Sequence, residues 1–349
     1  MKIGIVGLPG SGKTTVFNAL TGRKAEVSGY AGGKREPNMA VVSVPDERVE
    51  KLADRYHPKK VTPAQITYVD VAGEIAGKEE KGSALEETLR HLRPADALLI
   101  VLRNFERPGE PPDPQAELEA INAEFVLTDL ISVEKRLERL EKDASKGKKS
   151  DPRELELLRR ARDLLNTGTP LRSDNEIARS PLLKGYAFLS AKPCIAVINS
   201  GDDSEMGSVS LSLPADVPAI EVKGRLEMEL AQLTPEEADV FRQDFALEIP
   251  ATIRIIQESY RLLGLISFFT VGEDEVRAWT IPAGTQAQKA AGVIHSDIEK
   301  GFIRAEVISC DDLLESRSYA DAQRAGKVRL EGKEYPVRDG DVINFRFNV

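Results

Sequence analysis

The sequence predicts an α/β fold in which a helical hairpin interrupts one domain and a small α+β domain follows it. Three observations support this prediction. Residues 2–20 combine a short apolar run, a glycine-rich loop and a helical pattern. Between residues 115 and 165 an apolar residue recurs mostly every three or four residues, which is typical of amphipathic helices. From residue 265 onward, short apolar runs are separated by glycines, which is typical of a small domain with several strands.

The composition is that of an ordinary soluble protein. A chain of 349 residues is too long for one core, so we expect two or three domains. The net charge of −9 means that contact with a polyanion requires a local basic patch. No run of 18 apolar residues occurs and the first strand begins at Lys2, so we expect a cytoplasmic protein without a signal peptide or membrane span. Cys194 and Cys310 lack the spacing of a metal or disulfide framework.

Residues 7–14, GLPGSGKT, match the phosphate-loop pattern G-x-x-x-x-G-K-[ST] at every fixed position. A strand is predicted before the loop at 2–6 and a helix after it at 15–20. Glycines let the backbone approach a ligand, and successive N–H groups at a helix N-terminus bind phosphate. A glycine-rich turn that only connects strand to helix is the weaker alternative, because it gives the Lys-Thr pair no purpose. We predict a triphosphate site made by Gly10, Ser11, Gly12, Lys13, Thr14 and Thr15, in which the Thr14 hydroxyl holds Mg²⁺.

Two later segments are candidates for sensing the γ-phosphate. A strand at 65–69 leads into DVAG, where Asp70 is expected to support Mg²⁺ directly or through water, and Gly73 to offer its N–H. Glu74 stands where Ras-type switch proteins carry a Gln that orients the attacking water, and a solvated loop charge is the alternative. The loop at 23–38 occupies the place of the first switch but contains no Thr.

A purine-reading motif is predicted at the end of the strand at 194–198, where the sequence reads NSGD. Asn199 is placed to hydrogen-bond the purine N7, and the Asp202 carboxylate to accept from guanine N1–H and N2–H, which adenine lacks. Ser200 replaces the usual Lys of this motif, and a simple polar turn is the alternative. Lys223 follows the strand at 219–222, where a base-stacking loop is expected.

The long helical stretch predicts an antiparallel coiled-coil hairpin with a basic tip. Its helices are expected at about 115–142 and at 152–165. Residues 134–162 carry 11 Lys or Arg and 7 Asp or Glu. Such a tip favours contact with a phosphate backbone, and a solvated helix face is an equally good interpretation.

The remaining periodic segments complete the predicted organisation. Further strands are expected at 39–44, 95–102, 268–271, 276–281, 303–308, 328–330 and 342–347, and further helices at 46–56, 84–92, 226–233, 235–245, 253–263 and from 286. The predicted domains are a nucleotide-binding domain at 1–112 and 183–262, the inserted hairpin at 113–182 and a C-terminal domain at 263–349.

Several segments carry a resemblance to a known family. They are GLPGSGKTT near the N-terminus, VPDERVEKLA at 44–53, ELAQLTPEEADVF at 229–241, and residues 262–309 and 340–349 near the C-terminus. On these segments the chain resembles the YchF/Obg-like ATPase family along nearly its whole length. The resemblance implies a P-loop NTPase G domain with a coiled-coil insertion and a C-terminal TGS domain of ubiquitin-like β-grasp fold. It also implies binding and hydrolysis of ATP or GTP with Mg²⁺, and association with ribosomes.

The chain departs from the family pattern at three positions. Lys34 stands where the first switch carries Thr, and Glu74 where the family has a hydrophobic residue. Asp202 ends the base-reading motif, where the family commonly has a Glu that relaxes selection toward ATP. No catalytic residue is assigned. Two functions therefore stay open for this chain, which we expect to be a monomer: a slow NTPase that associates with the ribosome, or a non-catalytic scaffold that binds RNA or the ribosome and has a degenerate nucleotide site.

Overall fold

The computed structural model describes residues 1–23, 37–71, 83–149, 151–207, 209–214, 217–234, 237 and 250–348. The chain forms two compact units, Met1–Ala40 with Thr67–Ile255 and Val41–Ile66 with Ile256–Val349. This grouping differs from the predicted domain boundaries, because residues 41–66 pack with the C-terminal part of the chain. Within the described residues, no helix has both the length and the apolar surface needed to cross a membrane.

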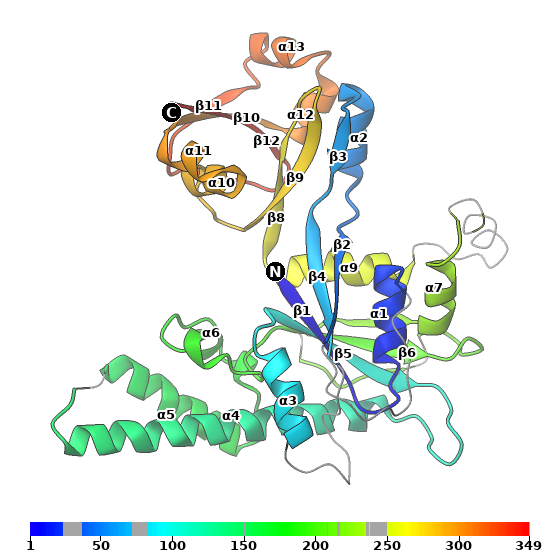
Figure 1. The fold of residues 1–349 in the computed structure, drawn as a ribbon, viewed down its shortest axis with the longest axis vertical. Helices are drawn as coiled ribbons and strands as arrows, with labels where there is room; N and C mark the ends of the chain where they lie inside the picture. Colours follow the sequence, from blue (N-terminus) through cyan, green and yellow to red (C-terminus); the bar gives the residue numbers. More distant parts are fainter. Residues whose placement is uncertain are drawn as a thin grey trace. The chain divides into compact units, whose positions relative to one another are not determined.

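The first unit is built on a largely parallel sheet with the strand order β2-β4-β1-β5-β6-β7 (Figure 1). The strands are β1 (Lys2–Val6), β2 (Asn38–Ser43), β4 (Gln65–Asp70), β5 (Ala97–Asn104), β6 (Cys194–Ser200) and β7 (Ala219–Val222). The helices connected to them are α1 (Lys13–Thr21), α3 (Ser83–Leu92) and α7 (Gly224–Leu230). Helix α9 (Ala251–Leu262) begins in this unit, and its residues from Ile256 onward belong to the second unit. Parallel pairing sets Ile5 beside Asp70 and Arg103 beside Asn199. The carboxyl ends of these strands therefore share one edge of the sheet, where α/β proteins place their ligands.

Helix α4 (Pro114–Ser145) belongs partly to this sheet and partly to the hairpin. Its first half packs Leu118, Ile121 and Phe125 into the core that contains Leu98 and Ile100 of β5. Its Asp129 is fully buried and accepts hydrogen bonds from the backbone N–H groups of Leu189 and Ser190, at 3.1 and 2.7 Å. The hairpin is therefore anchored to the segment that leads into β6.

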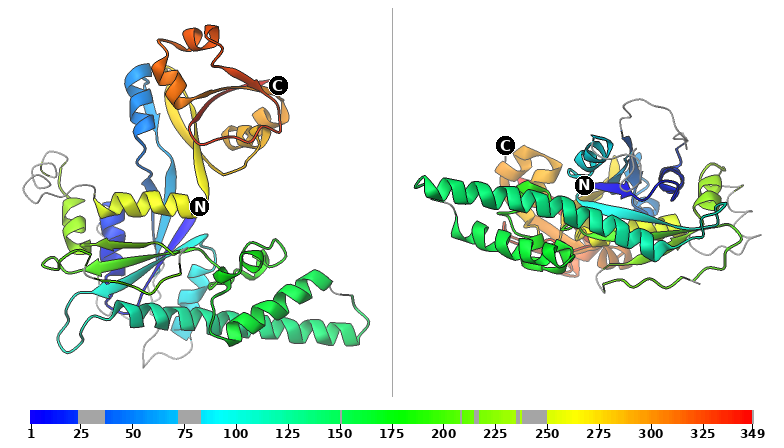
Figure 2. Two further views of the ribbon diagram at one scale, coloured as in Figure 1. Left: turned by 180° about the vertical axis from the view of Figure 1, so that it is seen from behind. Right: turned by 90° about the horizontal axis from the view of Figure 1, so that it is seen from below.

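The second half of α4 runs beside α5 (Pro152–Asn166), as Figure 2 shows. Asp113 and Asp151 cap the two helices, and each is followed by a proline in the first helical turn, which is a favoured place for proline. Apolar residues from both helices share one core, among them Val133, Leu137, Leu140, Leu157, Leu158 and Leu165. Three short helical turns follow, η1 (Leu171–Ser173), α6 (Asn175–Ala178) and η2 (Lys184–Tyr186). The 3.6-residue periodicity thus predicted both long helices, each within a few residues at its ends.

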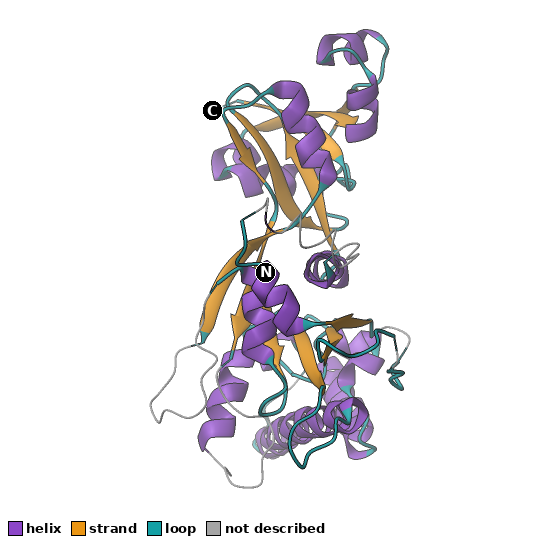
Figure 3. Cartoon of the chain, turned by 90° about the vertical axis from the view of Figure 1, so that its right-hand side faces the viewer, coloured by secondary structure: helices purple, strands orange, loops and turns teal. Residues whose placement is uncertain are grey.

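The second unit contains a sheet with the order β11-β10-β12-β8-β9-β3. Figure 3 draws the strands in orange and the helices in purple. Its strands are β3 (Lys60–Thr62), β8 (Leu265–Thr270), β9 (Glu275–Pro282), β10 (Phe302–Ser309), β11 (Arg329–Glu331) and β12 (Asp341–Phe347). Its helices are α2 (Glu47–Tyr56), α10 (Ala287–Ile294), α11 (Ser296–Lys300), α12 (Cys310–Glu315) and α13 (Tyr319–Arg324). Three alanines of α10 pack against Phe268, Phe302 and Phe345 of the sheet. The sequence did not predict β3, α11, α12 or α13, because segments this short leave too few residues to establish a period.

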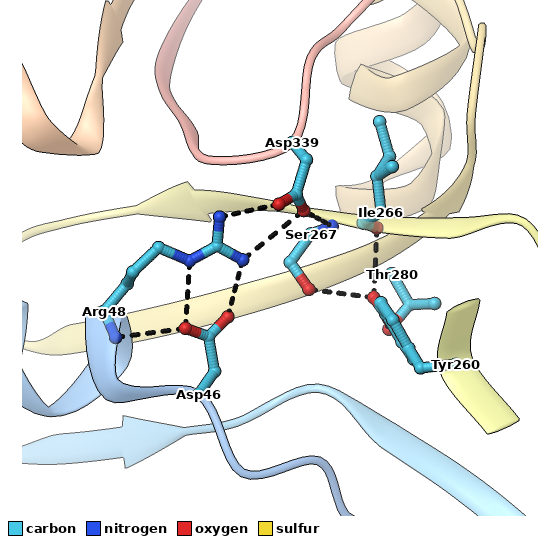
Figure 4. Close-up of polar contacts among 7 residues, drawn as sticks. All are labelled: Asp46, Arg48, Tyr260, Ile266, Ser267, Thr280 and Asp339. Carbon is cyan, nitrogen blue, oxygen red and sulfur yellow. Dashed lines mark hydrogen bonds and ion pairs between the residues drawn. The ribbon is translucent and has the colours of Figure 1, made fainter. Parts of the chain in front are cut away.

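A polar network explains why residues 41–66 belong to the second unit (Figure 4). The Arg48 guanidinium binds Asp46 at 2.8 Å and Asp339 at 2.7 Å. Asp339 also accepts from the backbone N–H of Ser267 at 2.8 Å, and the Ser267 hydroxyl contacts the Tyr260 hydroxyl at 2.8 Å. Strand β3 adds parallel pairing with β9. Side-chain and backbone contacts from distant parts of the chain therefore hold α2 and β3 in this unit.

Candidate functional site

The phosphate loop lies between the end of β1 and the start of α1, as predicted (Figure 1). Gly10 and Gly12 have φ angles of 72° and 89°, in the left-handed region that favours glycine. Gly12 is the N-cap of α1, and no side chain within the described residues caps this helix. Within the described part of the chain, the N-terminus of α1 therefore has no side-chain cap that competes with a ligand, and a helix N-terminus is a favourable place for an anion.

The loop packs closely on the neighbouring strand β5. A Cβ on Gly7 would lie 2.4 Å from the carbonyl oxygen of Val101 and 2.5 Å from Ser11 Oγ, so this position accepts only glycine. Ser11 is fully buried, and its hydroxyl oxygen has no hydrogen-bond partner within the described residues. A buried hydroxyl of this kind is a donor that a phosphate oxygen can satisfy.

Lys13 folds back over the loop that precedes it. Its Nζ donates to the carbonyl oxygens of Gly7 at 2.9 Å and of Leu8 at 3.1 Å. The ammonium group therefore lies against the loop itself. A phosphate would offer it charge-assisted hydrogen bonds, which are about twice as strong as those to neutral carbonyls.

Thr14 and Asp70 form the candidate metal site. The Thr14 hydroxyl donates to Asp70 Oδ2 at 2.9 Å, and Asn38 Nδ2 donates to the same oxygen at 3.5 Å. Asp70 is only 2% exposed, and its Oδ1 has no hydrogen-bond partner within the described residues. Burial raises the pKa of Asp70, while the Thr14 and Asn38 hydrogen bonds and the positive charge of Lys13 act in the opposite direction.

The oxygen atoms of Thr14 and Asp70 are suitable ligands for Mg²⁺. A buried carboxylate oxygen beside a hydroxyl offers the hard oxygen ligands that this ion prefers. No group of three or more His, Cys, Asp or Glu suited to a metal occurs among the described residues. A cation held here would therefore complete its shell with phosphate and water, which is the usual arrangement for Mg²⁺ at nucleotide sites.

Asn199 connects the phosphate loop with the start of α7. Its Nδ2 donates to the carbonyl oxygen of Ser11 at 3.0 Å, and its Oδ1 accepts from the backbone N–H of Gly224 at 3.1 Å. A Cβ on Gly12 would lie 2.1 Å from Asn199 Nδ2, and one on Gly224 would lie 2.5 Å from Oδ1. Asn199 is 4% exposed, so it braces the phosphate loop from within the protein.

The other residues of the predicted purine motif lie nearer the surface or point elsewhere. The Asp202 side chain is 45% exposed and lies 4.0 Å from Arg225, and Lys223 Nζ donates to the Asp202 backbone oxygen at 2.7 Å. Ser200 is buried, accepts from Asn104 at 2.8 Å and donates to Glu221. The amide group of Asn199 is thus bonded to the phosphate loop and to Gly224, and Lys223 is bonded to the backbone of Asp202. The Asp202 carboxylate stays half exposed.

Sequence reasoning missed Asn38 and Asn104, because neither belongs to a recognised spacing. The turn at 105–111 likewise matches no recognised spacing. Three positions discussed above, Lys34, Gly73 and Glu74, lie outside the described residues.

Comparison with known proteins places this geometry in a family. A model described as 50S ribosome-binding GTPase matches residues 2–150, and the YchF-GTPase_C model, described as a protein of unknown function, matches residues 265–348. A curated relative from Haemophilus ducreyi named ribosome-binding ATPase YchF is 41% identical, over 100% of this chain and 99% of its own. This chain belongs to the YchF family.

Two further relatives extend the match. The ribosome-binding ATPase YchF of Bacillus subtilis is 39% identical over 100% of both chains. The solved structure of the Schizosaccharomyces pombe YchF GTPase is 31% identical with a TM-score of 0.85, and the match covers 99% of this chain and 97% of that chain. The predicted family and the α/β phosphate-loop fold are therefore confirmed. The Schizosaccharomyces pombe relative is named a GTPase and the Haemophilus ducreyi and Bacillus subtilis relatives are named ATPases, so these names leave the base preference of this chain open.

Proposed function

We propose that this chain is a monomeric, cytoplasmic nucleoside triphosphatase that binds ATP or GTP with Mg²⁺ and associates with the ribosome. The observation that carries the proposal is the contact of the Thr14 hydroxyl with the buried Asp70, directly behind the glycine loop. This contact joins the phosphate loop to a carboxylate 56 residues away in the sequence. The names of the YchF relatives support the ribosomal partner.

Each residue of the site then has a physical role. The backbone N–H groups from Gly10 to Thr15 bind phosphate oxygens, and Lys13 leaves its carbonyl partners to neutralise the β- and γ-phosphates. Thr14 and Asp70 are the side chains that would hold Mg²⁺. When bound, Mg²⁺ neutralises the charge that develops during phosphoryl transfer. Gly73 is proposed to donate its N–H to the γ-phosphate.

Hydrolysis by the isolated chain is proposed to be slow. Phosphoryl transfer depends on positioning the attacking water and on neutralising charge. The sequence carries Glu74 in place of the Ras-type Gln and Lys34 in place of the switch Thr. A carboxylate adds negative charge where charge is already excessive, so Glu74 is a poor substitute for the Gln.

Base discrimination is proposed to be weak. Asp202 favours guanine, while the family resemblance favours adenine. The exposed carboxylate of Asp202 lies near Arg225, which competes with a base for the same oxygen atoms. Ser200 is bonded within the protein and provides no lysine to support the base.

The proposal is tested by single-turnover hydrolysis of ATP and GTP with and without ribosomes, combined with calorimetric binding. We expect Mg²⁺-dependent binding of both nucleotides, an affinity ratio below about 10³, and turnover that rises when ribosomes are added. Lys13→Ala is the control for binding elsewhere on the chain. Binding without turnover under every condition would favour the non-catalytic scaffold, and absence of binding would contradict the proposal as a whole.

The tip of the hairpin is proposed to form part of the ribosomal contact, together with the C-terminal domain at 263–349, which we assign as a TGS domain. Lys142, Lys146, Lys148 and Lys149 are all exposed, and Lys148 pairs with Asp143 at 3.1 Å. Exposed cations of this kind bind phosphate backbones in a salt-dependent way.

Replacing these four lysines with glutamates should therefore weaken co-sedimentation with ribosomes by at least about tenfold at low salt. The matched control replaces the same four residues with arginines, which keeps the charge and should preserve binding. Equal binding by both variants across a salt series would identify the tip as a solvated helix face.

A further inference from the structure

A buried arginine organises the turn that follows β5. Arg103 is 7% exposed, and its Nη1 donates to the carbonyl oxygens of Phe105 at 3.0 Å and Glu110 at 2.9 Å. Its Nη2 donates to the Pro111 carbonyl oxygen at 3.2 Å. Glu117 of α4 accepts from the Arg103 backbone N–H at 2.9 Å. One guanidinium group thus holds both ends of the 105–111 turn, so the turn has a defined position beside the sheet edge.

This turn sets Arg107 against the phosphate loop. A Cβ on Gly10 would lie 2.4 Å from Arg107 Nη1, 2.9 Å from Cζ and 3.3 Å from Nη2. The guanidinium group therefore rests directly on the backbone of Gly10. The turn is closed by the Glu110 N–H, which donates to the Arg107 carbonyl oxygen at 3.0 Å.

The ionic partner of Arg107 in the structure is weakly held. Arg107 Nη1 lies 3.4 Å from Glu110 Oε2, and the two side chains are 42% and 62% exposed. Exposed pairs of this kind contribute little and are screened by salt. A doubly charged phosphate group beside the same guanidinium is a stronger, bidentate acceptor.

We propose that Arg107 is a further phosphate-binding residue, which exchanges Glu110 for the phosphates of a nucleotide held by the loop. The inference rests on the proposed nucleotide binding and adds a cation from outside the phosphate-loop motif. The loop sequence at 7–14 carries one basic side chain, Lys13, so a second cation at the phosphates has to come from another segment. Arg107 and Lys13 then approach the phosphates from two different segments of the chain.

The test compares ATP and ADP affinities of the full chain and three variants by calorimetry with Mg²⁺. Arg107→Gln should weaken both nucleotides about tenfold and flatten the dependence of affinity on salt, because one charged contact is lost. Arg107→Lys keeps the charge without the bidentate geometry, so its nucleotide affinity should lie between those of the parent and Arg107→Gln. Glu110→Gln removes the competitor and should tighten binding about twofold to threefold. A residue that only supports the fold would not produce this tightening.

Two results would overturn the inference while the proposed function stands. One is unchanged affinity in Arg107→Gln in an assay where Lys13→Ala loses binding. The other is tighter binding by Arg107→Gln, which would identify the guanidinium as an obstacle to the nucleotide. Absence of binding by the unaltered chain would overturn both proposals. Thermal melting of each variant separates these outcomes from loss of fold.

Discussion

Replacing Asp70 with Asn should reduce Mg²⁺-dependent hydrolysis at least about 100-fold, equivalent to about 2.7 kcal/mol of barrier. The carboxylate is the charged ligand that the site offers to a cation, and the substitution removes its charge with little change of shape. Thr14 keeps an acceptor in the variant, because the amide oxygen of Asn replaces Asp70 Oδ2. Single-turnover hydrolysis across a Mg²⁺ titration measures the effect.

The same substitution should leave the free energy of unfolding unchanged or slightly higher. Asp70 is 2% exposed and one of its oxygens has no hydrogen-bond partner within the described residues, so its charge is poorly compensated in the folded state. Burial raises its pKa above the ordinary value of 3.8. A carboxyl whose pKa is higher in the folded state than in the unfolded state binds its proton more tightly when the protein is folded. This stabilisation is lost as the pH rises from the ordinary pKa through the raised one, so above that range the charge opposes folding.

Chemical denaturation of both proteins across a pH series from acidic to neutral tests this part of the prediction. The parent should lose stability relative to Asp70→Asn as the pH rises through that range. A variant that is both inactive and strongly destabilised would instead show that Asp70 has a structural role, and the metal assignment would lose its support.

Replacing Asn199 with Ala should reduce both stability and nucleotide affinity. The change leaves the Ser11 carbonyl and the Gly224 N–H without the partners that they have at 3.0 and 3.1 Å. Each unpaired buried group costs about 1–3 kcal/mol, so we expect a loss of about 3 kcal/mol in the free energy of unfolding. Because these groups hold the phosphate loop, ATP affinity should fall about 30-fold, or about 2 kcal/mol.

Two substitutions serve as controls for this prediction. Asp202→Ala removes an exposed side chain and should change stability by less than about 0.5 kcal/mol. Asn199→Asp keeps the acceptor for Gly224 but places an oxygen against the Ser11 carbonyl, so it should resemble Asn199→Ala. Parent-like stability in both Asn199 variants would mean that the phosphate loop and the segment at Gly224 keep their positions without this side chain.

The sequence by itself determined the local parts of this protein. The phosphate loop could be recognised because its function requires glycines, a lysine and a threonine at fixed spacings, which leaves a pattern within one short segment. The helices α4 and α5 could be recognised because burial of one face repeats every 3.6 residues. Each of these signals depends on residues that are close together in the sequence.

Tertiary structure alone decided which distant residues meet at the site. Thr14 contacts Asp70 and Asn199 contacts Ser11 across 56 and 188 residues, and Arg107 reaches Gly10 through a turn held by Arg103. It also decided that α2 and β3 pack with the C-terminal unit, through Arg48 with Asp339 and β3 with β9. Periodicity reports whether a residue is buried, but its partner depends on the path of the whole chain.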